Sequence, residues 1–217
     1  MGNLSMVRSL LSRLRHVGIH KVWKTVLEGA LIESRAGNVE TARRVLKYLM
    51  FHVPWYGPLY LEAYRLERDQ QRVNEALLIV ERGLRSIPRY GPLWFGALRL
   101  CEEIDASKQC HALSTTLAMI DRAMVSISKE LVWKIHLEAA QMHERAATRR
   151  SSVDDPGFDV LLDPARKRLS LTVLTCPANL RWKVWLAAAR MELSFGNTER
   201  ARLLFIRAHR AEPQKGR

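Results

Sequence analysis

The sequence predicts an all-α protein, a right-handed superhelical solenoid of about five helical hairpins, and three observations carry this prediction. In the first, four alanines are each followed twelve residues later by a proline: Ala42 and Pro54, Ala76 and Pro88, Ala165 and Pro177, Ala201 and Pro213. In the second, a glutamate stands nine residues before three of these alanines, at Glu33, Glu67 and Glu192. In the third, WYGPLY at 55–60 returns as RYGPLW at 89–94, 34 residues later. A period of this length is typical of stacked helical hairpins.

The composition favours helices around an apolar core. Of the 217 residues, 47% are hydrophobic, and the common residues Ala, Leu, Arg and Glu are good helix formers. The three cysteines, Cys101, Cys110 and Cys176, are odd in number and never spaced as C-x-x-C. This pattern indicates a reducing compartment instead of a disulfide framework. No apolar run approaches the roughly 18 residues of a membrane span, so we expect no membrane partner.

The net charge of +13 is distributed unevenly. Residues 1–27 carry five basic residues and no acidic ones, and residues 143–217 carry fifteen basic and eight acidic ones. The middle, 28–142, is nearly balanced, with fifteen basic and fourteen acidic residues. A groove that follows a nucleic-acid backbone along its whole length needs Lys and Arg throughout. The pattern therefore predicts two basic ends, where RNA could be contacted, in place of a continuous channel.

Residues 1–20 form a basic segment with two open interpretations. Val7, Leu10, Leu11 and Leu14 fall at helical spacing, with arginines between them. The segment can be the partial helix of a preceding repeat, with its apolar face packed on Trp23. Its richness in Arg and Ser and its lack of acidic residues are also typical of an organellar targeting peptide.

The first three hairpins follow from turn signals. A hairpin over 21–54 should turn at Ala36-Gly37-Asn38, because Gly and Asn tolerate the left-handed backbone that ends a helix. A second hairpin is expected over 57–88, and a third begins at Gly91. The proline in the first turn of both suits a helix start. About six extra residues within 104–112 lengthen the third turn.

The last two hairpins differ in regularity. The fourth has an insertion at about 146–163, and its stretch 151–164 contains two prolines, one glycine and four aspartates, which predicts an exposed loop. The fifth, 184–213, is the most regular and keeps an apolar second helix close to the chain end. We therefore expect a solenoid over 21–213 with a short tail at 214–217, belonging to a longer solenoid or covered by a partner.

The fifth repeat carries the residues of a known family. Trp185 is followed seven residues later by Glu192, then by a Gly-Asn turn, the pair Ala201-Arg202, and finally Pro213. This order resembles the half-a-tetratricopeptide (HAT) repeat over about 21–213. The Leu-Gly pair of ordinary tetratricopeptide (TPR) repeats is missing, since Trp94 is followed by FGAL. The third and fourth repeats lack the aligned Glu, so the pattern weakens there.

The resemblance implies a function. HAT proteins of the pre-mRNA splicing factor type are scaffolds of RNA-processing particles. The implied role is a nuclear, non-enzymatic scaffold that holds other proteins of a ribonucleoprotein complex in splicing, RNA 3′-end or rRNA processing, without a cofactor. Two alternatives remain: a mitochondrial or chloroplast protein whose helical repeats grip single-stranded RNA, and a generic TPR-like peptide-binding module. Self-association through the uncapped end is also open.

Several residues recur at fixed repeat positions, and this favours packing roles. The expected repeat-core residues are the aromatics Tyr60, Trp94, Trp133 and Trp185 and the small residues Ala42, Ala76, Ala165 and Ala201. The glutamates lie a full repeat apart, so no two need meet as a catalytic pair. We expect each to contact an arginine of its own or the adjoining repeat, such as Arg43 or Arg202.

The charges around the insertion form the candidate contact patch: Arg149, Arg150, Arg166, Lys167 and Arg168. They either bind RNA or an acidic segment beside the acidic insertion, or they are ordinary solvated helix surface. His136 and His143 lie seven residues apart, whereas helical metal sites prefer a spacing of four, so a surface role is expected. The sequence has no phosphate-binding glycine loop, no G-x-S-x-G and no zinc signature, and we expect no enzymatic activity.

Overall fold

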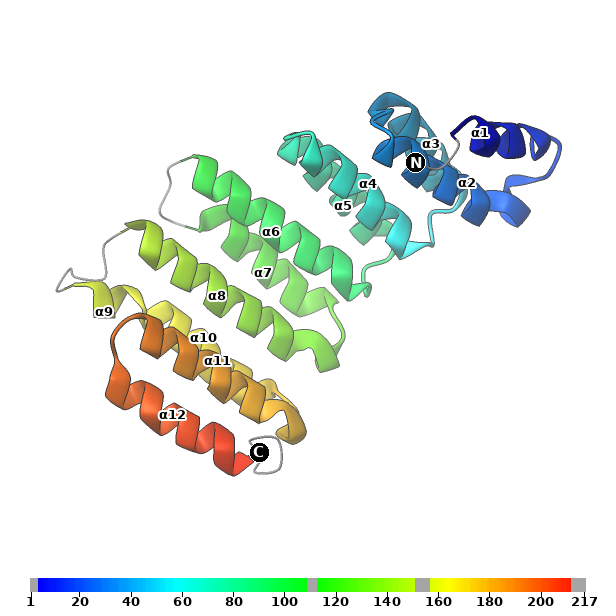
Figure 1. Ribbon diagram of the computed structural model, residues 1–217. Helices are drawn as coiled ribbons and strands as arrows, with labels where there is room; N and C mark the ends of the chain where they lie inside the picture. The colour runs from blue at the N-terminus through cyan, green and yellow to red at the C-terminus, as the bar shows by residue number, and fades with distance from the viewer. Residues whose placement is uncertain (1–3, 109–112, 151–156, 212–217) are drawn as a thin grey trace. The chain divides into compact units, whose positions relative to one another are not determined.

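The computed structural model describes residues 4–108, 113–150 and 157–211. Over these ranges the regular elements are all helices, and no strand is found. The chain forms two compact units, residues 1–104 and 105–217, each described by itself below. The predicted all-α fold of helical hairpins is therefore confirmed (Figure 1).

The first unit holds two complete hairpins and the start of a third. Its helices are α1 (Leu4–Arg13), α2 (Ile19–Arg35), α3 (Val39–His52), α4 (Gly57–Asp69), α5 (Val73–Ser86) and α6 (Gly91–Ser107), whose last residues belong to the second unit. Helix α2 pairs with α3, and α4 pairs with α5, so the predicted hairpins lie where the turn signals placed them. Helix α1 packs on α2 through Leu11, which fills the space beside Gly29. Trp23, expected to receive this segment, instead contacts Tyr56, with ring centroids 4.5 Å apart.

The second unit holds the longer, less regular hairpins. Its helices are α7 (Ser114–Ser126), α8 (Val132–Arg150), the short α9 (Phe158–Leu161), α10 (Asp163–Thr175), α11 (Arg181–Ser194) and α12 (Thr198–Ala211), with 3-10 turns at Lys129–Leu131 and Ala178–Leu180. Helix α8 pairs with α10, and α11 pairs with α12 (Figure 1). We call α2, α4, α6, α8 and α11 first helices. The second helices are α1, α3, α5, α7, α10 and α12.

The turns of three hairpins have one hydrogen-bond pattern. The amide of Asn38 donates to the carbonyl of Glu33, that of Arg72 to Glu67, and that of Asn197 to Glu192, each at 2.9 Å. One residue earlier the backbone is left-handed, with φ of 84° at Gly37, 60° at Gln71 and 77° at Gly196. This is the Schellman end of a helix, which satisfies carbonyls that the helix itself leaves free. Glycine accepts this φ readily, whereas Gln71 adopts it at a steric cost.

The same three glutamates also join consecutive repeats, each through an arginine of the preceding second helix. Nε and one terminal nitrogen of Arg43 donate to the two oxygens of Glu67 at 2.5 and 2.9 Å. Arg166 donates in the same way to Glu192 at 2.8 and 3.0 Å, and Arg8 donates to Glu33 at 2.7 and 2.9 Å. We call each of these two-bond contacts an inter-repeat arginine clamp. The partner of Glu192 is therefore Arg166 of the preceding repeat and not the suggested Arg202.

The helix seams bury the small residues and most of the aromatics of the repeat pattern. Ala42, Ala76, Ala165, Ala201, Tyr60, Trp94 and Trp133 are all buried. The Tyr60 hydroxyl donates to the carbonyl of Pro54, and the Trp94 indole donates to that of Pro88, so each buried ring satisfies its polar atom on the preceding repeat. Trp185 departs from the expectation. Its ring is only partly buried and lies 5.4 Å from the Arg207 guanidinium, because no described helix follows α12 to cover it.

The insertion is not the exposed loop that its composition predicts, at least where the structure describes it. Residues 151–156 lie outside the described ranges, but Phe158 and Leu162 are buried, and Phe158 contacts the Phe195 ring at 5.1 Å. Asp159 accepts hydrogen bonds from Arg166 at 2.6 Å and Arg200 at 3.1 Å. These contacts attach α9 to α10, α11 and α12. The hydrophobic residues of the stretch 158–162, FDVLL, indicate a packed helix, and the loop interpretation gave them too little weight.

Candidate protein-interaction surface

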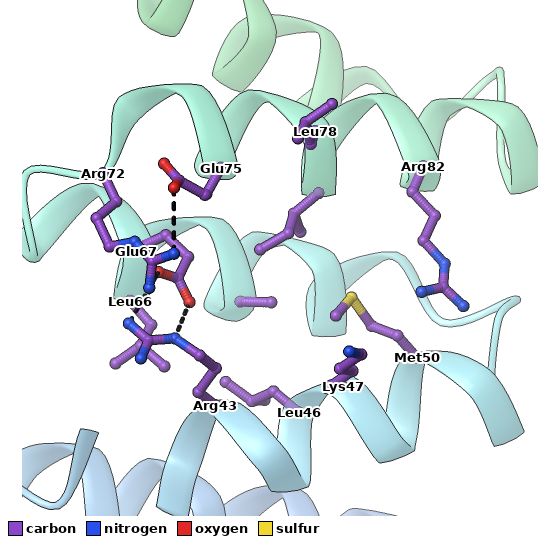
Figure 2. Close-up of a pocket in the computed structure, with 12 residues that line it drawn as sticks. Arg43, Leu46, Lys47, Met50, Leu66, Glu67, Arg72, Glu75, Leu78 and Arg82 are labelled. Carbon is purple, nitrogen blue, oxygen red and sulfur yellow. Dashed lines mark hydrogen bonds and ion pairs between the residues drawn. The ribbon is translucent and has the colours of Figure 1, made fainter. Parts of the chain in front are cut away.

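A groove crosses the outer side of α4, between the second helices α3 and α5, and encloses about 370 Å³ (Figure 2). Its apolar floor consists of Leu46 and Met50 from α3, Ala63 and Leu66 from α4, and Leu78 and Ile79 from α5. Leu78 is 63% exposed although it lines this cavity. The groove forms because α3 and α5 both pack on α4, and the space between the two second helices stays open.

One end of this groove is closed by charges that satisfy each other. Glu67 accepts from Arg43 and lies 3.4 Å from Arg72, which also bonds Glu75 at 3.1 Å (Figure 2). Arg43 has a further ion pair with Glu40. Contact with these carboxylates raises the pKa of Arg43, with the hydrogen bond to Glu67 as the largest cause. The carboxylate of Glu67 is fully engaged, so it serves the packing of repeats and is not placed to act as a general base.

The other end of the groove carries cations without such partners. Lys47 of α3 and Arg82 of α5 are exposed and line the same cavity, and Figure 2 shows them on the side away from Glu67. Within the part of the chain that the structure describes, no ion pair involves Lys47 or Arg82. An apolar floor that ends at two such cations fits an amphipathic segment with an acidic residue at that end.

Equivalent grooves occur at the same place in other repeats. One lies over α2, lined by Leu11 and Leu14 of the α1 region and Val45 and Tyr48 of α3, with about 330 Å³. Another lies in the second unit over α8, where Leu117, Ala146 and Val160 contribute to about 400 Å³. The first-helix side has a smaller hollow of about 180 Å³ between α8 and α11. These three larger hollows thus lie between second helices.

Exposed aromatic residues gather near the end of α3. Phe51 and Trp55 are largely exposed and Tyr48 is half exposed. The centroid of the His52 ring lies 4.2 Å from that of Tyr48 and 5.1 Å from that of Phe51. Large exposed aromatics are enriched among the residues that dominate protein interfaces. Their positions follow no repeat rule in the sequence, which is why the repeat pattern did not identify them.

The predicted basic patch is only partly available. Arg166 is mostly buried and bonded to Glu192, Asp159 and Asp163, so it is a structural residue and its place in the contact patch was wrong. The carboxylates raise the pKa of Arg166, that of Glu192 first. Arg149, Arg150 and Lys167 are exposed, whereas Arg168 is partly buried. The acidic insertion therefore neutralises part of this cluster, because Asp159 and Asp163 face Arg166 directly.

His136 is a second correction. It was expected at the surface, but its side chain is buried, at 6% exposure, in the α8 position where other first helices carry Ala63, Ala97 and Ala188. Among the described residues, its Nδ1 has no hydrogen-bond partner. Burial, and after it the charge of Arg168, lowers the pKa of His136, and the same two causes lower that of His143. His136 is thus a core residue of α8, whereas His143 is only partly buried.

The described residues offer no arrangement typical of catalysis by a metal. No group of three His, Cys, Asp or Glu side chains within 4–108, 113–150 and 157–211 could hold a metal ion. In the same ranges, none of the helices combines the length and the apolar character needed to cross a bilayer. Cys101 and Cys176 are buried and form no disulfide within the described ranges, and Cys110 lies outside them.

Comparisons with known proteins agree with this architecture. Residues 1–217 match the family described as PRP6, TPR-like domain. A TPR-containing protein of Dictyostelium discoideum is 46% identical over 147 residues, which are 67% of this chain and 11% of that protein. The chain thus spans about a ninth of the length of this relative. Among solved structures, the chain resembles MamA (TM-score 0.52, 12% identity, 86% of this chain and 95% of MamA). It also resembles BtubC from P. vanneervenii (TM-score 0.53, 10% identity, 99% and 89%), and identities this low show the fold alone.

Proposed function

Because the chain belongs to the PRP6 TPR-like domain family, we propose that this helical-repeat interaction module is a non-enzymatic scaffold in a nuclear RNA-processing particle, of the pre-mRNA splicing type. The observation that carries the proposal is the groove over α4, with its apolar floor and unpaired cations at one end. The name of the family supports a place in an RNA-processing particle. The groove supports a protein as the bound partner.

The groove fits an amphipathic helix. Such a helix would lay apolar side chains on Leu46, Leu66 and Leu78 and place an acidic side chain near Lys47 and Arg82. The cations would contribute mainly to orientation and association rate, because exposed ion pairs add little affinity. Leu78 would contribute most of the affinity, since its exposed side chain gains burial only in the complex.

A sedimentation experiment tests the scaffold role. Tagged wild-type chain and the variants Leu78→Glu and Leu174→Glu are added to nuclear extract and run through a glycerol gradient. Wild type should travel with a particle identified by its RNA, and Leu78→Glu should stay with free protein. Leu174→Glu is the matched control, because Leu174 is exposed on α10 and lies outside the groove. Equal sedimentation of both variants with the particle would exclude the groove as the binding site.

Direct RNA binding is the competing outcome and has its own measurement. The affinity of purified protein for a fluorescent single-stranded RNA is followed as salt rises. Direct binding should weaken by close to one log unit per log unit of salt for each phosphate neutralised. Because Arg166 is already paired with Glu192 inside the protein, we expect the protein to bind RNA only weakly, even at low salt. Tight, steeply salt-dependent binding would instead favour an RNA-gripping protein.

A further inference from the structure

The outward face of α12 differs from the matching face of the other second helices. Four residues after the small residue of the repeat, Leu46, Val80 and Leu169 are 2%, 0% and 7% exposed. The equivalent residue of α12 is Phe205, four residues after Ala201, and it is 38% exposed. Leu203 and Ile206 are exposed too, but so are their equivalents Leu78 of α5 and Lys47 of α3, so the difference lies at Phe205.

The earlier residues are buried by the first helix of the next repeat. Leu169 belongs to one apolar cluster with Val184, Ala188 and Met191 of α11. Leu46 lines the groove with Ala63 and Leu66 of α4. The Phe205 position is therefore one that a first helix occupies elsewhere in this chain.

An arginine on the same face completes the likeness. Arg43 and Arg166 directly follow the small residues Ala42 and Ala165, and both clamp a glutamate of the next first helix. Arg202 follows Ala201 in the same way and is exposed. Over the described ranges, Arg202 makes neither a hydrogen bond nor an ion pair. Arg202 therefore stands at the position of the arginines that form clamps in earlier repeats.

The last element of the face is a small residue that permits close approach. Ala208 stands seven residues after Ala201, where α5 has Gly83. A side chain added at Gly83 would meet Leu93 and Tyr60 at under 3.0 Å, so that helix contact depends on a small residue. The small side chain of Ala208 likewise leaves room beside Phe205 for a helix to approach α12.

From these observations we propose that the face formed by Arg202, Phe205 and Ala208 binds an amphipathic α-helix with one glutamate among apolar residues. The bound helix would lie as α4 lies on α3. Its glutamate would receive two hydrogen bonds from Arg202, and its apolar side chains would cover Phe205. Complementary charge and the three clamps already present in the chain identify this occupant.

A defined probe tests this proposal with the full 217-residue protein. The probe is a fluorescent peptide of residues 57–69, held helical by a cross-link on its exposed side, because so short a helix is marginal in water. Fluorescence anisotropy should show saturable binding. Arg202→Glu should weaken it by about tenfold or more, since a carboxylate then faces a carboxylate. A peptide with Glu67→Lys should bind Arg202→Glu better than it binds wild type.

Two controls make the outcome decisive. Arg85→Glu makes the same charge change on an exposed residue of α5 and should leave the affinity within about twofold. Circular dichroism checks that each variant keeps its helices. Absence of peptide binding to wild type, or equal effects of Arg202→Glu and Arg85→Glu, would overturn the proposal. So would a wild-type dimer in sedimentation velocity that Phe205→Asp dissociates, because the occupant would then be a second copy.

Discussion

The Arg43–Glu67 clamp of the first unit and the Arg166–Glu192 clamp of the second use the same two side-chain types in different surroundings. Glu67 has a second arginine, Arg72, beside it, and Arg43 also meets Glu40. In the second unit Glu192 has Asn197 as its additional donor, and Arg166 takes on Asp159 and Asp163 of the inserted segment. The Arg43–Glu67 clamp holds two repeats together, whereas the Arg166–Glu192 clamp also attaches the inserted segment. An insertion is thus tolerated where the arginine that joins the repeats can bind it too.

The largest effect expected is on the second clamp. Arg166→Ala would leave Glu192 without its arginine and release Asp159 and Asp163, and it should lower the free energy of unfolding by about 3–5 kcal/mol. Arg43→Ala should cost about 2 kcal/mol, because Arg72 still lies 3.4 Å from Glu67. Urea unfolding followed by circular dichroism measures both, with Arg210→Ala as a neutral control. Equal losses for the two variants would show that the insertion adds nothing to the clamp.

A smaller effect on the free energy of unfolding is expected to distinguish the turn at Gln71 from the turn at Gly196. Gly196→Ala places a side chain at φ 77° and should cost about 1 kcal/mol. Gln71→Gly relieves the same strain at φ 60° and should raise the free energy of unfolding by up to about 1 kcal/mol. Thermal unfolding checks the opposite signs, and a loss of stability in Gln71→Gly would contradict the Schellman interpretation.

Between pH 7.5 and 5.5 a pH effect is expected in the second unit, which holds both histidines whose pKa is shifted. Burial lowers the folded-state pKa of His136, so its neutral form is favoured in the folded protein. The folded state is then most stable above the unfolded pKa of about 6.5 and loses stability as pH falls below it. His143 shares the shift, so His136→Leu should remove part of the loss. The double variant with His143→Leu should remove most of it. Melting temperatures at pH 7.5 and 5.5 measure this dependence.

The smallest effect expected concerns α9 alone. The hydrogen bond from Arg166 lowers the pKa of Asp159 to about 2, so this contact is complete above the usual aspartate pKa of about 4. It should be lost as pH falls from about 4 to 2. Asp159→Asn should weaken α9 at neutral pH in the same way. Hydrogen exchange of residues 158–162 should accelerate while that of α4 stays unchanged, and unaltered protection of α9 would contradict this role.

Much of the fold was predictable from local signals. Turn residues such as Gly37 and Gly196 and the prolines at helix starts act through backbone geometry, which depends on nearby sequence. They placed the hairpins at 21–54 and 57–88 correctly. Prediction failed where side chains from distant segments meet. His136 looked like a surface residue because nothing local shows that α10 covers it, and Phe158 looked like loop because its partner Phe195 lies 37 residues away.

The sequence by itself determined the repeating helical hairpin and the buried positions of Ala42, Tyr60 and Trp94, since periodic apolar spacing fixes which side of a helix is buried. Only the tertiary structure decided which arginine meets each glutamate, which basic residues remain exposed, and where grooves stay open. The reason is that Arg43, Arg166 and Arg202 have the same local sequence context, an alanine just before them. Their roles differ only through the helix packed, or not packed, against them.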